Sequence, residues 1–210
     1  MHDQKKLWNN AHSKDSIHHY SSQQTSFFVE VESVLSSNSR ILELGCGVGN
    51  DSIAFSNAGH EIIATDLSEV AIEKNRDRFK DSPHIKFKIL DMNDPFPFEH
   101  GEFDVVYARL SLHYFTDVTT RKIFSEIYRV LKPGGYLCFI CKSTSDPLYG
   151  KGTEIERDMY NHEGHIRHFF SEEYVRSLMD GGFEIDKMES GEEMFYGNDS
   201  AYVKVIARKI

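Results

Sequence analysis

The feature that most constrains this chain is a short apolar run that leads into three closely spaced glycines. Residues 40–44 read Arg-Ile-Leu-Glu-Leu, and Gly45, Gly47 and Gly49 follow at alternate positions. Glycines this close together are useful where the backbone needs a positive φ, or where a ligand approaches closer than a Cβ would permit. Helix-forming residues follow from Ser52 to Phe55. The pattern predicts a ligand-binding loop between a strand and a helix.

A second apolar run ends in a carboxylate at the distance expected for a nucleoside site. Residues 61–66 read Glu-Ile-Ile-Ala-Thr-Asp, so Asp66 lies 21 residues after Gly45. In a βαβ nucleotide-binding unit, an acid at this spacing lies at the tip of strand 2 and accepts hydrogen bonds from ribose hydroxyls. The loop and Asp66 together predict a nucleoside pocket.

The residues around the glycines narrow the choice of nucleoside. A phosphate-binding loop would close with Gly-Lys-Ser or Gly-Lys-Thr, whereas Asn50 and Asp51 follow Gly49 here. An acid in the first turn of the helix would repel a phosphate, so ATP and GTP are disfavoured. The dinucleotide fingerprint G-x-G-x-x-G is also absent, because the third glycine arrives one residue early.

The stretch from Glu43 to Gly49 resembles motif I of the class I S-adenosylmethionine-dependent methyltransferases, and further motifs of that family follow in order. They are Asp66, Leu90-Asp91-Met92, Phe103 to Ala108 with Leu112 to Phe115, and Leu131 to Gly135. The resemblance, strongest to small-molecule types such as the thiopurine and tellurite-resistance groups, implies S-adenosylmethionine as cofactor and S-adenosylhomocysteine as product. It also implies an α/β fold: a doubly wound, mostly parallel seven-stranded sheet of order 3-2-1-4-5-7-6 with the last strand antiparallel, a Rossmann-like arrangement.

The same resemblance assigns site residues. Those it implies for cofactor binding are Glu43, Gly45, Cys46, Gly47, Gly49, Asp66, Leu67, Asp91, Met92, Ala108 and Arg109. It places His113 just after strand 4, near the transferring methyl group, where it is the candidate general base; a core or helix-capping histidine is the alternative. Arg109 either binds a substrate anion or pairs with an acid.

The chain is expected to form a single domain over residues 1–210 with four parts. These are an N-terminal arm and helix (1–39), a cofactor-binding core (40–143), a substrate-facing cap of irregular structure (144–170), and a helix with a terminal β-hairpin (171–210). The arm is predicted either to close over the site as a lid or to fray, with Trp8 packed on the core. Candidate substrate contacts are Trp8, Tyr20, Arg109, His113, Tyr149, Arg167 and His168.

Local patterns predict several elements within these parts. Ser68 and Ser171 are expected to cap helices, because serine is a favoured N-cap residue. A helix is expected over the apolar positions from Ile123 to Leu131, and the final hairpin is expected from strands at 183–189 and 202–207. His162, His165 and His168 recur at spacing three, but Gly164 argues against a helix that would gather them, and no metal site is expected.

Composition limits the partners. The chain has 210 residues with 24 Lys and Arg against 33 Asp and Glu, a net charge of −9, which disfavours binding to nucleic acid phosphates. A small-molecule substrate and a monomer or homodimer are expected. No signal peptide or membrane-length apolar run is seen, which predicts a cytoplasmic protein with no membrane partner. Cys138 and Cys141 fall in one apolar run and are expected on its opposite faces as buried residues.

The predicted function is therefore transfer of a methyl group to a small-molecule acceptor by in-line displacement. The acceptor atom, whether oxygen, nitrogen, sulfur or another soft nucleophile, is left open. Two alternatives remain: an NAD(P)-dependent oxidoreductase built on the same βαβ geometry, and a non-catalytic protein that binds the cofactor, since a fold does not dictate function.

Overall fold

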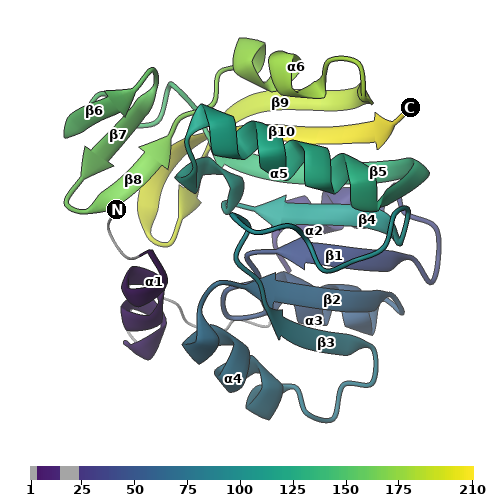
Figure 1. The fold of residues 1–210 in the computed structure, drawn as a ribbon. Helices are drawn as coiled ribbons and strands as arrows, with labels where there is room; N and C mark the ends of the chain where they lie inside the picture. The colour runs from purple at the N-terminus through teal and green to yellow at the C-terminus, as the bar shows by residue number, and fades with distance from the viewer. Residues whose placement is uncertain (1–3, 15–23) are drawn as a thin grey trace.

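A computed structural model describes residues 4–14 and 24–210 and shows a twisted sheet with helices on both faces (Figure 1). Its seven strands follow the order β3-β2-β1-β4-β5-β10-β9. The strands are β1 (Arg40–Leu44), β2 (Glu61–Asp66), β3 (Ile85–Ile89), β4 (Phe103–Arg109), β5 (Leu131–Lys142), β9 (Phe183–Phe195) and β10 (Asn198–Lys209). β1 to β5 pair in parallel, while β10 runs antiparallel to both β5 and β9. The predicted order and the antiparallel last strand are confirmed.

The helices cover the two faces of the sheet in separate groups. One face packs against α2 (Ser26–Glu32), α3 (Asn50–Asn57) and α4 (Glu69–Arg78), and the other against α5 (Asp117–Val130) and α6 (Glu172–Met179). Apolar side chains of the central strands alternate between the two cores, as residues of a strand covered on both faces must. Cys138 lies in the first core and Cys141 in the second, both fully buried, as expected.

The predicted helix caps are present. Ser68 Oγ accepts a hydrogen bond from the Ala71 N–H at 3.2 Å, and Ser171 Oγ accepts one from the Tyr174 N–H at 3.1 Å. Each serine thus satisfies one N–H that the first helical turn leaves unpaired. The helix expected to reach Leu131 ends earlier: Leu131 is extended (φ −73°, ψ 139°) and begins β5, since Pro133 disfavours helical backbone just before it.

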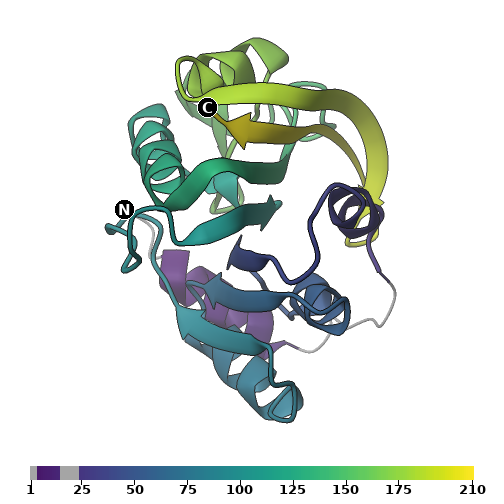
Figure 2. The same ribbon diagram turned by 90° about the vertical axis from the view of Figure 1, so that its right-hand side faces the viewer.

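The terminal hairpin is longer than the sequence predicts. β9 continues past residue 189 to Phe195, and the chain reverses at Tyr196 and Gly197, which have φ of 53° and 78°. Two consecutive positive φ values are typical of the type I′ turn that joins hairpin strands. The acidic stretch 189–193 lacks the apolar alternation of a strand, and its pairing with β10 holds it extended. Figure 2 shows the long, curved β9–β10 ribbon bending toward α2.

The segment expected to be irregular, residues 144–170, contains a small antiparallel sheet. Its order is β6-β7-β8, formed by β6 (Thr153–Glu156), β7 (Met159–His162) and β8 (His165–His168). The two tight turns each include a residue with positive φ, Asp158 at 61° and Glu163 at 54°, the latter followed by Gly164. The expectation of an irregular cap was therefore wrong, because turn-forming residues every few positions favour a short meander.

Both the small sheet and the N-terminal helix lie at one edge of the molecule. Figure 1 shows α1 (Gln4–Ser13) and the β6–β8 sheet beyond the arrowheads of β1 and β4, which are the carboxyl ends of the parallel strands. In open α/β sheets ligands bind at this edge, where the strand order reverses. Here the reversal falls between β1 and β4.

Candidate active site

The glycine loop joins β1 to α3 in the conformation that its sequence predicts. Gly45, Gly47 and Gly49 have φ of 78°, 52° and 81°, a region that disfavours side chains. Gly45 also packs tightly: a Cβ there would lie 2.4 Å from the Cβ of Ser111, whose hydroxyl donates to the Leu44 carbonyl at 2.6 Å. Ser111, which follows β4, therefore packs against the start of the loop and holds it in place.

Asp66 ends β2 and faces the glycine loop. Its Oδ2 accepts a hydrogen bond from the Gly47 N–H at 2.9 Å, and its Oδ1 accepts one from the Ser68 N–H at 2.8 Å. A carboxylate has about four lone-pair sites, so it can accept more hydrogen bonds than these two. The position predicted for a ribose ligand therefore lies beside the predicted loop.

The other cofactor candidates lie around this loop, with one exception. Asp91 follows β3 and accepts hydrogen bonds from the N–H and the side-chain amide of Asn93 at 2.9 and 2.7 Å, while Leu67 and Met92 are partly buried. Cys46 is buried, and burial raises the pKa of its thiol, so it remains protonated. The side chain of Ala108 is fully buried in the core that faces α5, so it cannot itself touch a ligand in this conformation.

Behind the loop lies a buried acidic network that the sequence did not predict. Asp51 Oδ1 accepts from the Thr25 hydroxyl at 2.9 Å, and its Oδ2 accepts from the Tyr107 hydroxyl at 2.8 Å. Glu43, 4% exposed, accepts from Ser52, and burial together with Asp51 and Asp66 raises its pKa to about 8. In the sequence Tyr107 looks like one more apolar residue of a central strand. Only the structure shows that its hydroxyl donates to Asp51 in this network.

Arg109 belongs to this network rather than to the cap. Burial lowers its pKa, but Tyr196, Asp51 and Tyr107 outweigh burial and raise it. Its guanidinium lies 5.3 Å from the centre of the Phe195 ring, in the terminal hairpin. The acid-pairing alternative for Arg109 thus fits its surroundings.

The N-terminal helix covers the loop from outside. A Cβ on Gly47 would lie 3.7 Å from Cε1 of His12, and the Lys74 ammonium donates to the His12 carbonyl at 2.9 Å. Asn9 Oδ1 accepts from the Ser68 hydroxyl at 2.9 Å. Burial and Lys74 lower the pKa of His12 to about 4, so its imidazole is neutral at physiological pH. The lid alternative for the arm matches this placement over residues 4–14, whereas Tyr20 lies outside the described residues.

Trp8 connects the arm to the rest of the site. Its ring centre lies 5.0 Å from that of Tyr114 and 6.3 Å from that of His165. Tyr114 belongs to η1 (Leu112–Tyr114), the short 3₁₀ helix after β4, and His165 belongs to β8. We call Trp8, Tyr114 and His165 the aromatic cluster. Its members come from three distant parts of the sequence, so spacing could not have predicted it.

The catalytic candidate His113 lies in η1 and is fully buried. Neither ring nitrogen has a hydrogen-bond partner among the described residues, and burial together with Arg167, Lys142 and His168 lowers the pKa of His113 well below the usual value. The imidazole is therefore neutral, but its low pKa and full burial make it a weak proton acceptor, which favours the core-histidine alternative over the general base. η1 packs directly against β8, which brings Arg167 close to His113 and Tyr114.

The remaining substrate candidates lie on other sides of the small sheet. His168 is buried against Phe170 and Tyr174, with ring centres 5.3 and 4.6 Å away. The Tyr149 hydroxyl donates to Asp158 at 2.7 Å, so Tyr149 braces a turn of the cap. Of the three cap candidates, Arg167 and His168 both come close enough to His113 to lower its pKa, and Arg167 has the larger effect.

Two further features bear on what the site can hold. Surface hollows of about 430 and 410 Å³ lie beside the 95–102 loop and between α5 and α6, and neither includes a predicted cofactor residue. Within residues 4–14 and 24–210, no three His, Cys, Asp or Glu side chains form a group that could hold a metal ion. In the same residues no helix is both long and apolar enough to cross a membrane.

Comparison with solved structures assigns the fold. A structure from Methanosarcina mazei described as a SAM-dependent methyltransferase superposes with a TM-score of 0.75 at 24% identity, covering 86% of this chain and 97% of that one. The N-methyltransferase NodS from Bradyrhizobium japonicum, solved with S-adenosylhomocysteine, superposes with a TM-score of 0.73 at 16% identity, covering 99% and 98%. The molecule thus has the Rossmann-like methyltransferase fold.

The sequence comparison is more specific. Residues 41–135 match the methyltransferase domain family. The demethylmenaquinone methyltransferase of Clavibacter sepedonicus is 36% identical over 109 residues, which are 52% of this chain and 43% of that protein. The chain therefore spans less than half the length of this curated relative. Residues 41–135 are thus similar to a methyltransferase domain, in line with the family that the sequence motifs resemble.

Proposed function

We propose that this protein transfers a methyl group from S-adenosylmethionine to a small-molecule acceptor. The observation that carries this proposal is the acidic surrounding of the glycine loop, formed by Glu43, Asp51 and Asp66. Such a surrounding favours a ligand that carries positive charge near the loop and opposes the pyrophosphate of a dinucleotide. S-adenosylmethionine is a nucleoside with cationic sulfonium and ammonium groups, so its charge complements this site.

Different residues around the loop would bind different parts of the cofactor. In this proposal Asp66 would accept hydrogen bonds from the ribose hydroxyls, and Asp91 and Met92, which follow β3, would contact the adenine. Glu43 is buried next to the glycine loop. A bound cation would favour ionisation of the Glu43 carboxyl, which would add an attraction. The cofactor supplies an electrophilic methyl group, and the protein's task is to hold the acceptor in line with it.

The acceptor would enter where α1, η1 and β8 meet, beside the glycine loop. The net charge of −9 supports a small molecule over a nucleic acid as substrate. A cytoplasmic location, a monomeric or homodimeric state and the absence of a membrane partner remain predictions.

The first test is a calorimetric titration with S-adenosylhomocysteine and, separately, with NADH. We expect micromolar binding of the first alone, because a nucleoside bound through several hydrogen bonds has an affinity of this order (about −8 kcal/mol). Asp66→Ala should abolish binding, whereas the matched control Asp77→Ala, an exposed acid on α4, should leave it unchanged. Binding of NADH alone would replace the proposal with the oxidoreductase alternative.

Gly47→Val provides a second check on the loop. Its branched side chain should block the cofactor, since it would project toward His12 from a backbone with positive φ. A folded variant that binds S-adenosylhomocysteine normally would refute the loop assignment.

A further inference from the structure

The junction between η1 and the cap contains buried polar atoms that nothing in the described chain satisfies. Both ring nitrogens of His113 and the Nε of Arg167 have no hydrogen-bond partner. Leaving a buried polar group unpaired costs about 1–3 kcal/mol, so such groups usually have a ligand or water as partner. His113 is fully buried, and the junction adjoins the glycine loop through Ser111.

The junction is also electrostatically opposite to the loop. Among the described residues Arg167 has no carboxylate partner, and the groups that act on His113 are Arg167, Lys142 and His168, none of them acidic. Lys142 is already paired with Asp146 at 2.7 Å, which leaves Arg167 as the uncompensated charge. Burial raises the pKa of Tyr114 to about 12, so its hydroxyl stays neutral and does not balance Arg167. A partly buried cation without a counter-ion favours an anionic ligand.

The side chains that flank Arg167 add a shape preference. The aromatic cluster, Trp8, Tyr114 and His165, lies against this junction. Aromatic faces stack on flat rings and contribute about 0.5–1.5 kcal/mol beyond their buried area. Trp8 lies on α1, whereas Tyr114 lies in η1 just after β4 and His165 lies in β8 of the small sheet.

We propose that this junction binds the methyl acceptor, and that the acceptor is an aromatic weak acid whose ring hydroxyl is held as an oxyanion at Arg167. This inference rests on the proposed function and names its substrate class. The hydroxyl proton leaves to solvent as Arg167 stabilises the oxyanion, and neutral His113 donates a ring N–H to the same oxygen. The oxygen lone pair then forms the new carbon–oxygen bond to the methyl group, while the carbon–sulfur bond breaks and its electron pair returns to sulfur. The acidic loop thus takes the cationic donor, and the basic junction takes the anionic acceptor.

The test uses 4-nitrophenol, whose absorbance distinguishes phenol from phenolate, and the protein saturated with S-adenosylhomocysteine. At a pH below the probe's own pKa, we expect it to bind as phenolate, because Arg167 stabilises the anion. The neutral isostere 4-nitroaniline should bind at least about tenfold more weakly, a difference of about 1.4 kcal/mol. Equal binding of the two probes would overturn the inference without any variant.

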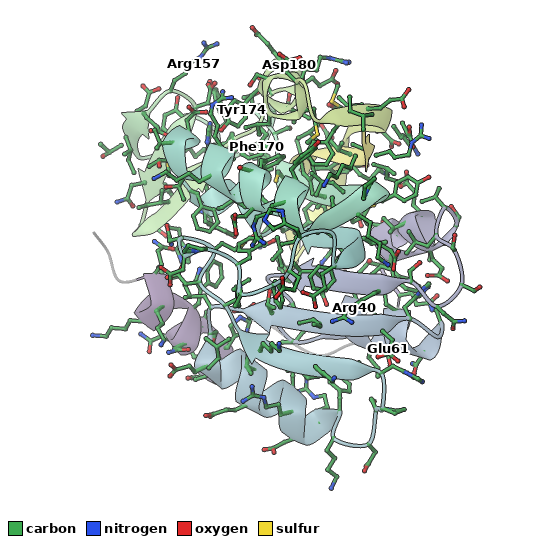
Figure 3. The ribbon with its side chains drawn as sticks, turned by 45° about the vertical axis from the view of Figure 1, so that its right-hand side comes forward. Arg40, Glu61, Arg157, Phe170, Tyr174 and Asp180 are labelled. Atoms are coloured by element: carbon green, nitrogen blue, oxygen red, sulfur yellow. The ribbon has the colours of Figure 1, made fainter. Side chains whose placement is uncertain are left out.

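Variants locate the charge. Arg167→Gln should weaken phenolate binding about tenfold and abolish the absorbance shift, whereas Arg167→Lys should retain part of both. The control Arg157→Gln removes an arginine that is 88% exposed and points away from the body of the molecule (Figure 3), and it should change nothing. Affinity for S-adenosylhomocysteine should be equal in all these proteins. A phenolate affinity unaffected by Arg167→Gln would overturn the inference.

The role of His113 is tested by binding of 4-nitrophenolate. His113→Leu removes the ring N–H and should weaken this binding, whereas His113→Asn keeps an N–H donor and should retain part of it. Equal binding by the wild type and His113→Leu would remove His113 from the acceptor site. Failure of the wild-type protein to bind S-adenosylhomocysteine would instead refute the proposed function, so the two failures are distinguishable.

Discussion

At the scale of single residues, the glycine loop depends on two different properties of glycine. Gly45 needs both a positive φ (78°) and the space that a Cβ would take from Ser111. Gly134 has a similar φ of 75° but no atom within 4 Å of its Cβ position. Substitutions at Gly45 and Gly134 therefore distinguish the free-energy cost of a positive φ from the additional cost of close packing.

We predict that Gly45→Ala lowers the free energy of unfolding by about 2–4 kcal/mol, because left-handed strain of about 1 kcal/mol adds to overpacking of about 1–3 kcal/mol. Gly134→Ala should lower it by about 1 kcal/mol only. Urea unfolding monitored by circular dichroism measures both. Equal losses for the two variants would show that Ser111 does not confine the loop.

Glu43 leads to a prediction on pH. Its pKa is raised from 4.5 to about 8 in the folded protein, first by burial and then by Asp51. Between these values the folded state keeps a proton that the unfolded state has lost, so the free energy of unfolding falls as pH rises. Glu43→Gln should remove this decline and gain stability relative to the wild type by up to about 1.4 kcal/mol per pH unit. Urea unfolding from pH 5 to pH 8 tests it, with exposed Glu154→Gln as control. Parallel curves for wild type and Glu43→Gln would contradict the prediction.

At the scale of elements, the small sheet depends on one close contact between its strands. A Cβ at Gly152, just before β6, would lie 2.1 Å from the carbonyl oxygen of Asn161 in β7, whereas Gly150 has similar φ and an open Cβ position. The three strands pair only with one another in the main ladders, since the only bridge between the cap segment and the large sheet joins Ser143 and Phe170 among the described residues. The backbone pairing of the small sheet is therefore separate from that of the large sheet.

We predict that Gly152→Ala opens the β6–β7 pairing and increases hydrogen exchange across residues 153–168, while Gly150→Ala does not. Affinity for S-adenosylhomocysteine should be unchanged in both, because the glycine loop and Asp66 lie outside the cap. If Gly152→Ala lost both the β6–β7 pairing and its affinity for S-adenosylhomocysteine, the small sheet would belong to the cofactor site.

At the scale of the whole molecule, α1 and the cap close the carboxyl edge of the sheet by contacts that cross most of the chain. Trp8 is the single tryptophan, so its fluorescence reports on this closure. Asn9→Ala removes the acceptor for the Ser68 hydroxyl and should weaken the docking of α1 by about 1 kcal/mol. We expect acrylamide to quench Trp8 fluorescence more strongly in Asn9→Ala than in the wild type. In the control Asn10→Ala, which changes an exposed residue, quenching should equal that of the wild type. Equal quenching in the two variants would mean that Asn9 does not hold the arm.

Much of the architecture could be predicted because it depends on local signals. Ser68 and Ser171 cap the helices predicted for them, and the spacing of Gly45 and Asp66 correctly placed the loop beside the tip of β2. The hairpin beyond residue 189 and the sheet within 144–170 were not predicted, since cross-strand pairing rather than an apolar repeat holds these acidic and turn-rich stretches extended.

The sequence by itself therefore determined the loop, the helix caps and the position of Asp66, because glycine spacing and capping act between near neighbours, while the sheet order followed from the resemblance to the methyltransferase family. Only the tertiary structure decided the surroundings of each candidate. It directed Arg109 to the acidic network, buried His168 against α6, and brought Arg167 to His113 beside Trp8. These contacts join residues that are up to 157 positions apart along the chain, and no local pattern encodes which side of a strand will meet a distant helix.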